Sequence, residues 1–164
     1  MEEATAHPFD PPRIEIGRSL LLAGLSMRYT CDGSPGISAQ WQRFLTFFGR
    51  IPGQQGRVAY GVNHNADDNG GFDYLCGVEV SAFSGLPDYM NRLQLPQKPY
   101  AVFTHRGHVS TILRTHGIIW NSWLPPSGYV ATGGPFFERY DETFDPATGL
   151  GGIEIWIPIR QRRL

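Results

Sequence analysis

A single carboxylate in an aromatic setting is the most informative chemical feature of the sequence. Glu138 lies between Phe136 and Tyr140 within residues 135–141. If this segment is a β-strand, alternate side chains point to opposite faces, so Phe136, Glu138 and Tyr140 share one face. Burying a lone carboxylate is costly, so Glu138 is expected to accept local hydrogen bonds, to stay protonated or to meet a cationic ligand. The alternative is a solvated Glu138 beside Arg139 on an edge strand.

Other aromatic side chains could line a pocket around this carboxylate. Ring faces attract cations within about 6 Å, and each such contact is worth about 0.5–2 kcal/mol. Besides Phe136 and Tyr140, the candidates are Trp41, Tyr74, Trp120 and Trp123. Each of these rings could instead belong to the hydrophobic core. Because Trp120 and Trp123 are three residues apart, they share a face if the segment is a helix, and at least one could border the pocket.

The remaining reactive side chains form no recognisable motif. His105, His108 and His116 are divided between an expected strand end and an expected helix, so they need not converge. Cys31 and Cys76 lack CxxC spacing, and two thiols alone do not complete a zinc site. No nucleophile elbow is present. We therefore expect no metal, no cofactor and two reduced thiols.

Composition indicates one soluble domain. The chain has 164 residues, of which 41% are hydrophobic, 13% aromatic and only 18% charged. This is too apolar for disorder, and no apolar run approaches the 18–20 residues or so of a membrane span. A net charge of −1 argues against a dedicated nucleic-acid binder. The acidic start lacks the features of a signal peptide, so we expect a cytoplasmic protein without direct contact to nucleic acid or membrane.

Hydrophobic periodicity predicts one helix and three strands in each half of the chain. In the first half, strands are expected at 13–29, 57–65 and 72–83, with a helix capped by Ser38. In the second half, strands are expected at 100–105, 136–144 and 153–159. The second helix is expected to be capped by Ser110 and to have an apolar face of Ile112, Leu113, Ile119, Trp120 and Trp123. Residues 1–12 are expected to be a flexible lead.

The two halves resemble each other. Gly70 and Gly71 precede one expected strand, and Gly151 and Gly152 precede another 81 residues later. We therefore predict an α+β fold of two pseudo-symmetric β-α-β-β repeats, residues 13–85 and 97–162, with antiparallel sheets and a helix each, in a single domain of residues 13–164. One such repeat has a sheet face that it cannot bury alone. Two repeats around a pseudo-two-fold axis are expected to leave a central ligand cleft.

Four segments in order resemble the effector-binding, GyrI-like superfamily: residues 71–80, 100–107, 134–140 and 152–159. That superfamily includes ligand domains of AraC- and MerR-type regulators and stand-alone integron-cassette proteins. The resemblance covers about residues 13–160 and implies two repeats around a hydrophobic cavity. It also implies that a buried glutamate, at the position of Glu138, recognises lipophilic and often cationic aromatic compounds. Of the aromatic residues, the resemblance carries over Tyr140 weakly and none of the others.

The sequence thus predicts a stand-alone binding module for lipophilic, cationic aromatic small molecules. The ligand would stack between rings, and Glu138 would neutralise its cationic end. Two alternatives stay open. One is a hydrolase of reactive cyclopropane-type compounds, in which Glu138 and Tyr140 would activate water. The other is a protein-interaction module, as in superfamily members that bind DNA gyrase, with a partner that the sequence leaves unidentified. Regulators of the superfamily carry a helix-turn-helix DNA-binding domain. The twelve residues before the first expected strand are too few to form one, so we expect none there.

Overall fold

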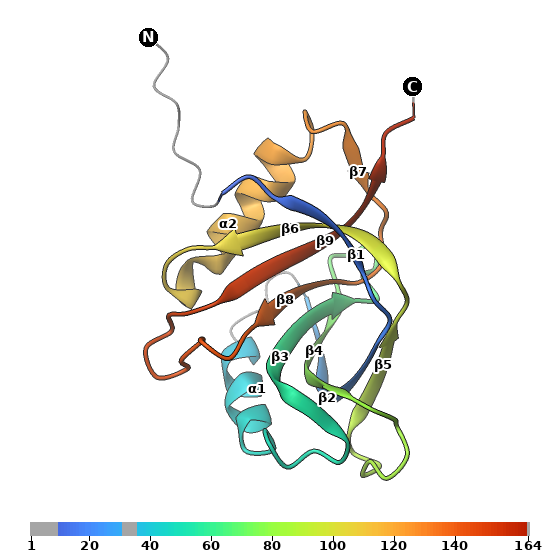
Figure 1. Cartoon of the computed structure of the whole chain (residues 1–164), viewed down its shortest axis with the longest axis vertical. Coiled ribbons are helices and arrows are strands. Elements are labelled where there is room, and N and C mark those ends of the chain that lie inside the picture. The colour runs from blue at the N-terminus through green and yellow to red at the C-terminus, as the bar shows by residue number, and fades with distance from the viewer. Residues whose placement is uncertain (1–9, 31–35, 164) are drawn as a thin grey trace.

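The computed structural model describes residues 10–30 and 36–163, in which two helical regions pack on one antiparallel sheet (Figure 1). Its strands are β1 (Arg13–Gly17), β2 (Leu20–Tyr29), β3 (Gln54–His64), β4 (Phe72–Val80), β5 (Asn91–Leu95), β6 (Lys98–His105), β7 (Tyr129–Ala131), β8 (Phe136–Tyr140) and β9 (Ile153–Gln161). Helix α1 spans Gly36–Leu45. Helix α2 (Ile112–Ile118) follows the 3-10 turn η1 (Val109–Thr111) and continues into the π-helical segment η2 (Ile119–Trp123). The α+β class expected from the sequence is confirmed.

The strand order is β1-β6-β9-β8-β3-β4-β2-β5, and β7 pairs with the end of β9. The first half of the chain supplies β3, β4 and β2 on one side of the centre, and the second half supplies β8, β9 and β6 on the other. The halves join where β3 pairs with β8. The two sets of strands form one continuous sheet, whereas separate antiparallel sheets were expected. A pseudo-two-fold relation between the two halves stays a prediction.

One strand expected at residues 13–29 is in fact two. β1 pairs with β6 of the second half, whereas β2 pairs with β4 and β5, so the chain changes edges between Gly17 and Leu20. A Cβ on Gly17 would lie 2.7 Å from a ring carbon of Tyr100, so the backbone at the end of β1 passes directly beside that ring. Strands β5 and β7 were not expected, because each is too short to show a clear alternation.

Both helix starts differ from the expected ones. Helix α1 begins at Gly36, so Ser38 lies inside its first turn. In the second helical region the N-cap is His108, whose ring nitrogen accepts a hydrogen bond from the Ser110 backbone N–H at 3.0 Å. Ser110 therefore lies within the 3-10 turn. Leu113, expected on the buried face, is 71% exposed, because at 3.6 residues per turn it points away from the face that buries Ile112, Thr115 and Ile119.

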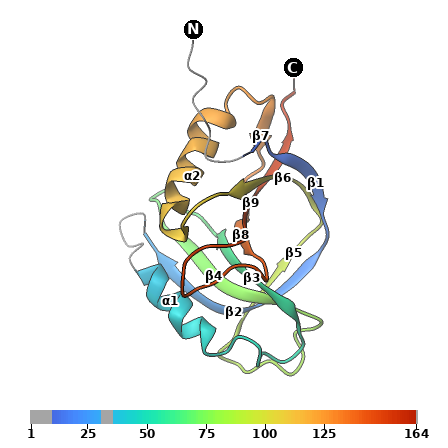
Figure 2. The same ribbon diagram turned by 60° about the vertical axis from the view of Figure 1, so that its left-hand side comes forward.

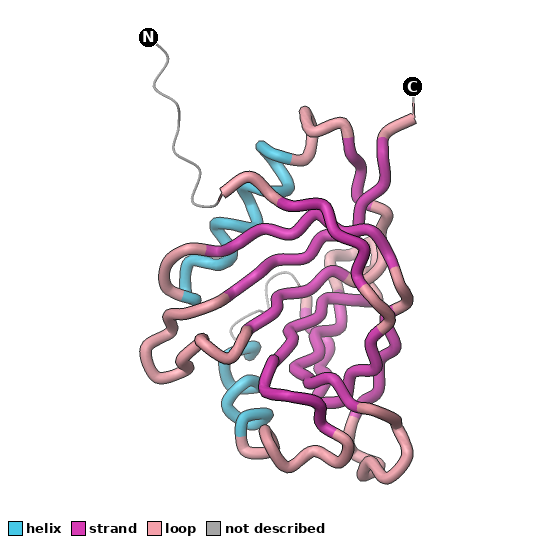
Figure 3. The backbone as a smooth tube through the Cα atoms, viewed as in Figure 1, coloured by secondary structure: helices cyan, strands magenta, loops and turns pink. Residues whose placement is uncertain are grey.

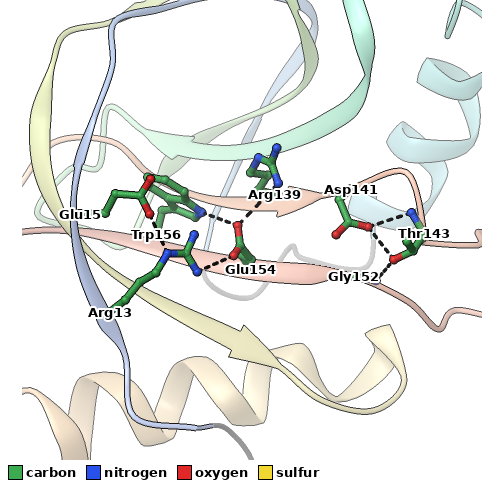
Figure 4. A network of polar contacts seen from close by, with 8 residues as sticks. All are labelled: Arg13, Glu15, Arg139, Asp141, Thr143, Gly152, Glu154 and Trp156. Carbon is green, nitrogen blue, oxygen red and sulfur yellow. Dashed lines mark hydrogen bonds and ion pairs between the residues drawn. The ribbon is translucent and has the colours of Figure 1, made fainter.

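The strand of Glu138 ends earlier than expected. Residues 136–144 were expected to be extended, but β8 stops at Tyr140. Figure 4 shows the cause: the Asp141 carboxylate accepts hydrogen bonds from the Thr143 backbone N–H and hydroxyl, and Thr143 in turn accepts one from Gly152 N–H. An Asx turn of this kind competes with the strand ladder and turns the chain toward β9. The strand expected at 72–83 likewise ends at Val80.

The sheet is buried on both faces. Figures 1 and 2 place α1 and α2 on the same side, where they share a core with Ile153, Ile155 and other β9 residues. The opposite face has its own cluster, which includes Trp156 and Phe137 and contains no helical residue. The tube in Figure 3 shows the helices confined to one side of the strands. Phe136, Glu138 and Tyr140, which were expected to share one face of their strand, point toward this helix-covered side. None of the described helices is long and apolar enough to cross a bilayer.

A close approach of two strands restricts one sheet position to glycine. Gly24 of β2 is paired with Gly77 of β4, and a Cβ on Gly24 would lie 1.8 Å from the backbone oxygen of Cys76. Since that obstacle is backbone, relief requires the two strands to separate. In contrast, a Cβ on the helical Gly117 would meet nothing within 4 Å.

We expect Gly24→Ala to lower the free energy of unfolding by about 2–4 kcal/mol, because the new methyl group overpacks a backbone contact. Gly117→Ala should instead raise it by up to about 1 kcal/mol, since alanine is the better helix former. Urea unfolding of both variants measures the difference. A Gly24→Ala variant as stable as the wild type would contradict the strand geometry.

Candidate functional site

Glu138 lies at the centre of the sheet. Its strand, β8, runs between β3 and β9 and is therefore not an edge strand. The residue is 6% exposed and is directly opposite Gly61 of β3. Within β8, Phe136 and Tyr140 face the same side as Glu138, whereas Phe137 and Arg139 face the helix-free side. The site carboxylate is thus held on the strand pair that joins the two halves of the chain.

Three side chains bond the Glu138 carboxylate. The Tyr140 hydroxyl donates to Oε2 at 2.5 Å, and the Tyr74 hydroxyl approaches the same oxygen at 3.3 Å. The other oxygen, Oε1, lies 3.1 Å from Nε2 of His116 on α2. Trp41 of α1 extends the network by donating from its indole N–H to the Tyr74 hydroxyl at 3.1 Å. Glu138 therefore makes the local hydrogen bonds expected of a buried carboxylate.

Burial keeps the neighbouring donors neutral. It raises the pKa of the Tyr74 and Tyr140 hydroxyls well above the ordinary tyrosine value, and the negative charge of Glu138 adds to both shifts. Burial also raises the pKa of the Cys76 thiol, again with a smaller contribution from Glu138. At neutral pH these groups are therefore protonated dipoles. They can donate hydrogen bonds to the carboxylate but cannot neutralise its charge.

Rings from both helices surround the carboxylate network. On the α1 side, the Trp41 ring lies 5.2 Å from that of Tyr140 and 6.4 Å from that of Tyr74. On the α2 side, Phe136 lies edge to face with Trp120 at 5.5 Å. Edge-to-face geometry of this kind is favourable and fixes the ring orientations. The structure therefore brings six of the seven candidate residues together: Glu138, Tyr140, Phe136, Trp120, Tyr74 and Trp41.

Trp123 lies apart from this group. Its ring contacts Phe103 at 4.9 Å and stacks on Tyr129 at 6.3 Å. The π-helical segment explains the divergence, because the Leu124 N–H bonds the carbonyl of Ile119, five residues back. A wider turn of this type rotates residues three apart away from a common face. A ligand-binding role for any of the seven residues stays a prediction.

Two residues of the site were missed by the sequence reasoning. His116 was considered only as a metal ligand, although its spacing of four from Trp120 would have placed both on one helix face. Gly61 carried no signal at all. A Cβ there would lie 2.1 Å from the Tyr74 hydroxyl and 3.2 Å from a ring carbon of Trp41. The missing side chain is what allows the Tyr74 hydroxyl to lie beside Glu138.

A hollow of about 370 Å³ lies on the helix-free face, and the aromatic part of its lining is Tyr60, Tyr100, Phe137 and Trp156. Charged side chains of its lining form ion pairs, most of them with one another, whereas Arg18 pairs with Glu79 outside the lining. Figure 4 shows Arg13 between Glu15 and Glu154, and Glu154 in contact with Arg139 and the Trp156 indole N–H. The acidic side chains of this hollow are thus paired with arginine, unlike Glu138, which neither lysine nor arginine bonds among the described residues. The ligand cleft expected at Glu138 stays a prediction.

The described residues contain no group of three His, Cys, Asp or Glu side chains that could hold a metal ion. Of the two cysteines, Cys76 is a buried thiol on β4, and Cys31 lies outside the described residues. Most of the lead expected at 1–12 also lies outside them.

Comparison with known proteins agrees with this architecture. Residues 11–160 match the family model of the GyrI-like small molecule binding domain. The chain belongs to this family. It is also 34% identical over 125 residues to the transcriptional regulator BrlR of Pseudomonas aeruginosa. That match covers 75% of the chain but 46% of BrlR, so this GyrI-like domain spans less than half of the regulator's length.

Two solved structures share the GyrI-like fold. The integron cassette protein VCH_CASS2 of Vibrio cholerae superimposes with a TM-score of 0.69 at 19% identity, over 93% of this chain and 97% of its own. SAV2435, solved bound to tetraphenylphosphonium, superimposes with a TM-score of 0.70 at 20% identity, over 91% and 93% of the two chains. At these identities the likeness concerns the fold.

The stability of this GyrI-like domain should fall as the pH rises above about 10. The folded-state pKa values of Tyr74 and Tyr140 are raised, so the unfolded chain releases these protons first. Each tyrosine then costs up to about 1.4 kcal/mol per pH unit. Urea unfolding between pH 8 and 11 measures the slope, which Tyr140→Phe should reduce and the exposed Tyr89→Phe should not. Equal slopes in all three proteins would disprove the burial of these hydroxyls.

Gly61→Ala should lower the free energy of unfolding by about 1–3 kcal/mol, because the new methyl group overlaps the Tyr74 hydroxyl. Tyr74→Phe removes that hydroxyl, so the double variant should recover part of the loss. A double-mutant cycle by urea unfolding measures the coupling, which we expect to be about 1 kcal/mol. Additive losses would mean that the two residues do not meet.

Proposed function

We propose that this GyrI-like domain binds lipophilic aromatic cations at Glu138, between helices α1 and α2. One observation carries the proposal: a carboxylate 6% exposed is bonded by two tyrosine hydroxyls and one histidine, and no lysine or arginine is among its bonding partners in the described residues. A buried charge of this kind is stabilised only in part by hydrogen bonds, so a cation that reaches it gains a strong electrostatic contact.

The surrounding rings suit the apolar part of such a ligand. Burying its aromatic surface supplies about 25 cal/mol per Å², and the ring faces of Trp41, Tyr140 and Trp120 can add cation–π contacts. The charge of Glu138 then discriminates among ligands of one shape, because it attracts cations and repels anions. The domain is accordingly a charge-selective binder rather than a general hydrophobic pocket.

The comparisons support this proposal at the level of the family. The family description is small-molecule binding, and SAV2435 was solved with tetraphenylphosphonium, a lipophilic aromatic cation. BrlR, which is 34% identical over 125 residues, is a transcriptional regulator. Binding by this chain could therefore serve regulation through a partner that remains unidentified.

Binding is favoured over the hydrolase alternative. The family description concerns small-molecule binding, and SAV2435 was solved with a bound aromatic cation. No observation selects the protein-interaction alternative. The hydrolase alternative is an outcome of the experiment with tetraphenylphosphonium and Glu138→Gln.

We expect wild-type protein to bind tetraphenylphosphonium more tightly than tetraphenylborate, an anion of the same shape. Glu138→Gln keeps the shape of the site and removes its charge. It should weaken tetraphenylphosphonium binding about tenfold to hundredfold, corresponding to about 1–3 kcal/mol, and should not weaken tetraphenylborate binding. Isothermal titration calorimetry with both ions measures the coupling between residue and ligand charge.

The matched control is Glu142→Gln, which removes an exposed carboxylate and should leave both affinities unchanged. Equal losses for both ions in Glu138→Gln would indicate a structural role for Glu138 and would refute the proposal. Mass spectrometry of the incubated ligands, with a set that includes cyclopropane-bearing compounds, tests turnover. Consumption by the wild type but not by Glu138→Gln would establish the hydrolase alternative.

A further inference from the structure

We propose that His116 occupies the place of the ligand's cationic group on Glu138, so that the ligand must displace this side chain and a proton on it opposes binding. The inference rests on the proposed function and adds to it a residue that determines when the site accepts a cation. It makes His116 a specificity-determining residue of the domain.

The contact lies inside the protein. Nε2 of His116 is 3.1 Å from Oε1 of Glu138, and the two side chains are 11% and 8% exposed. The other oxygen of Glu138 is held by tyrosines of the sheet itself, Tyr140 on β8 and Tyr74 on β4. His116 is thus the partner that belongs to a covering helix. A cation can take Oε1 from His116 without disturbing the strand ladder that holds Glu138.

The surroundings of His116 are suited to such a displacement. Its ring meets Phe136 edge to face at 5.9 Å, and its Nε2 bonds Glu138. The next residue, Gly117, borders open space, since a Cβ there would meet nothing within 4 Å. The π-helical segment η2 begins two residues later, and π-type turns are frequent at functional sites.

The other titratable groups near His116 either keep one charge state or do not bond Glu138. Among the described residues, His116 is therefore the group that can gain a charge beside Glu138. On β8 and β4, Tyr140, Tyr74 and Cys76 have raised pKa values and stay neutral below pH 8. On β6, the ring nitrogens of His105 contact Thr115 and the His108 backbone oxygen rather than Glu138. Arg114, on α2 itself, is exposed and always charged.

Protonation of His116 acts twice against a cationic ligand. The imidazolium forms an ion pair with Glu138 that the ligand has to break, and its charge repels the ligand. Histidine side chains in general change charge between about pH 5 and 8, so this is the range in which the effect is tested. By linkage, one competing proton weakens binding at most tenfold per pH unit.

Tetraphenylphosphonium is the probe of choice because its charge does not depend on pH. We expect wild-type affinity to fall about threefold to tenfold from pH 8 to pH 6. His116→Gln, which retains a hydrogen-bond donor but does not titrate, should lose this dependence and bind more tightly than the wild type at pH 6. The matched control His64→Gln changes a histidine of β3 that has no described contact with Glu138, and should behave as the wild type.

The outcomes separate the two proposals. Wild-type protein that fails to bind the probe, or binding that is indifferent to Glu138→Gln, would overturn the proposed function. Binding that depends on Glu138, with superimposable pH profiles for the wild type and His116→Gln, would overturn the inference alone. A nitrogen NMR spectrum of the wild-type imidazoles provides a second test that needs no variant. The His116 signal should move toward that of a solvated imidazole when the probe is added, and an unmoved signal would overturn the inference.

Discussion

The arrangement of the molecule depends on holding one carboxylate inside a sheet, away from water. Glu138 lies on the strand that joins the two halves, and the Tyr140 hydroxyl two residues away bonds it at 2.5 Å. The remaining partners come from further away in the chain, Tyr74 from the first half and His116 from the second helix. Gly61 completes the arrangement by leaving the space that the Tyr74 hydroxyl fills. Loss of Tyr74 would leave the Trp41 indole N–H without its acceptor, which is costly in an apolar interior.

The carboxylates on the two faces of the sheet have different kinds of partner. On the helix-free face, Arg13 and Arg139 pair with Glu154, and Arg13 also pairs with Glu15, so the charges compensate one another at a partly exposed rim. On the helix-covered face, Glu138 has neutral tyrosines and one histidine as partners. The charges beside the hollow are therefore paired with charges of opposite sign, whereas neither lysine nor arginine bonds Glu138 among the described residues. Chemistry, rather than empty volume, favours Glu138 as the ligand site.

Much of the fold could be predicted because it follows from local patterns. The alternation of Phe136, Glu138 and Tyr140 with Phe137 and Arg139 places the two sets on opposite faces, as observed. The segments later seen as β3, β4, β6, β8 and β9 were expected to within a few residues at most of their ends. The exceptions have tertiary causes. The break after Gly17 follows from pairing with a strand of the other half, and the early end of β8 follows from a hydrogen bond between Thr143 and Gly152.

The sequence by itself determined that a carboxylate and two aromatic rings share a strand face, because side-chain alternation needs only neighbouring residues. It also contained the four segments that resemble the GyrI-like family. Only the tertiary structure decided which groups bond the carboxylate, because Tyr74 and His116 are 64 and 22 residues away and reach it through strand register and helix packing. The separation of Trp123 from Trp120 likewise required the π-helical turn, which depends on one hydrogen bond from Leu124 to Ile119. Local periodicity specifies a face, whereas long-range packing specifies the partners that meet there.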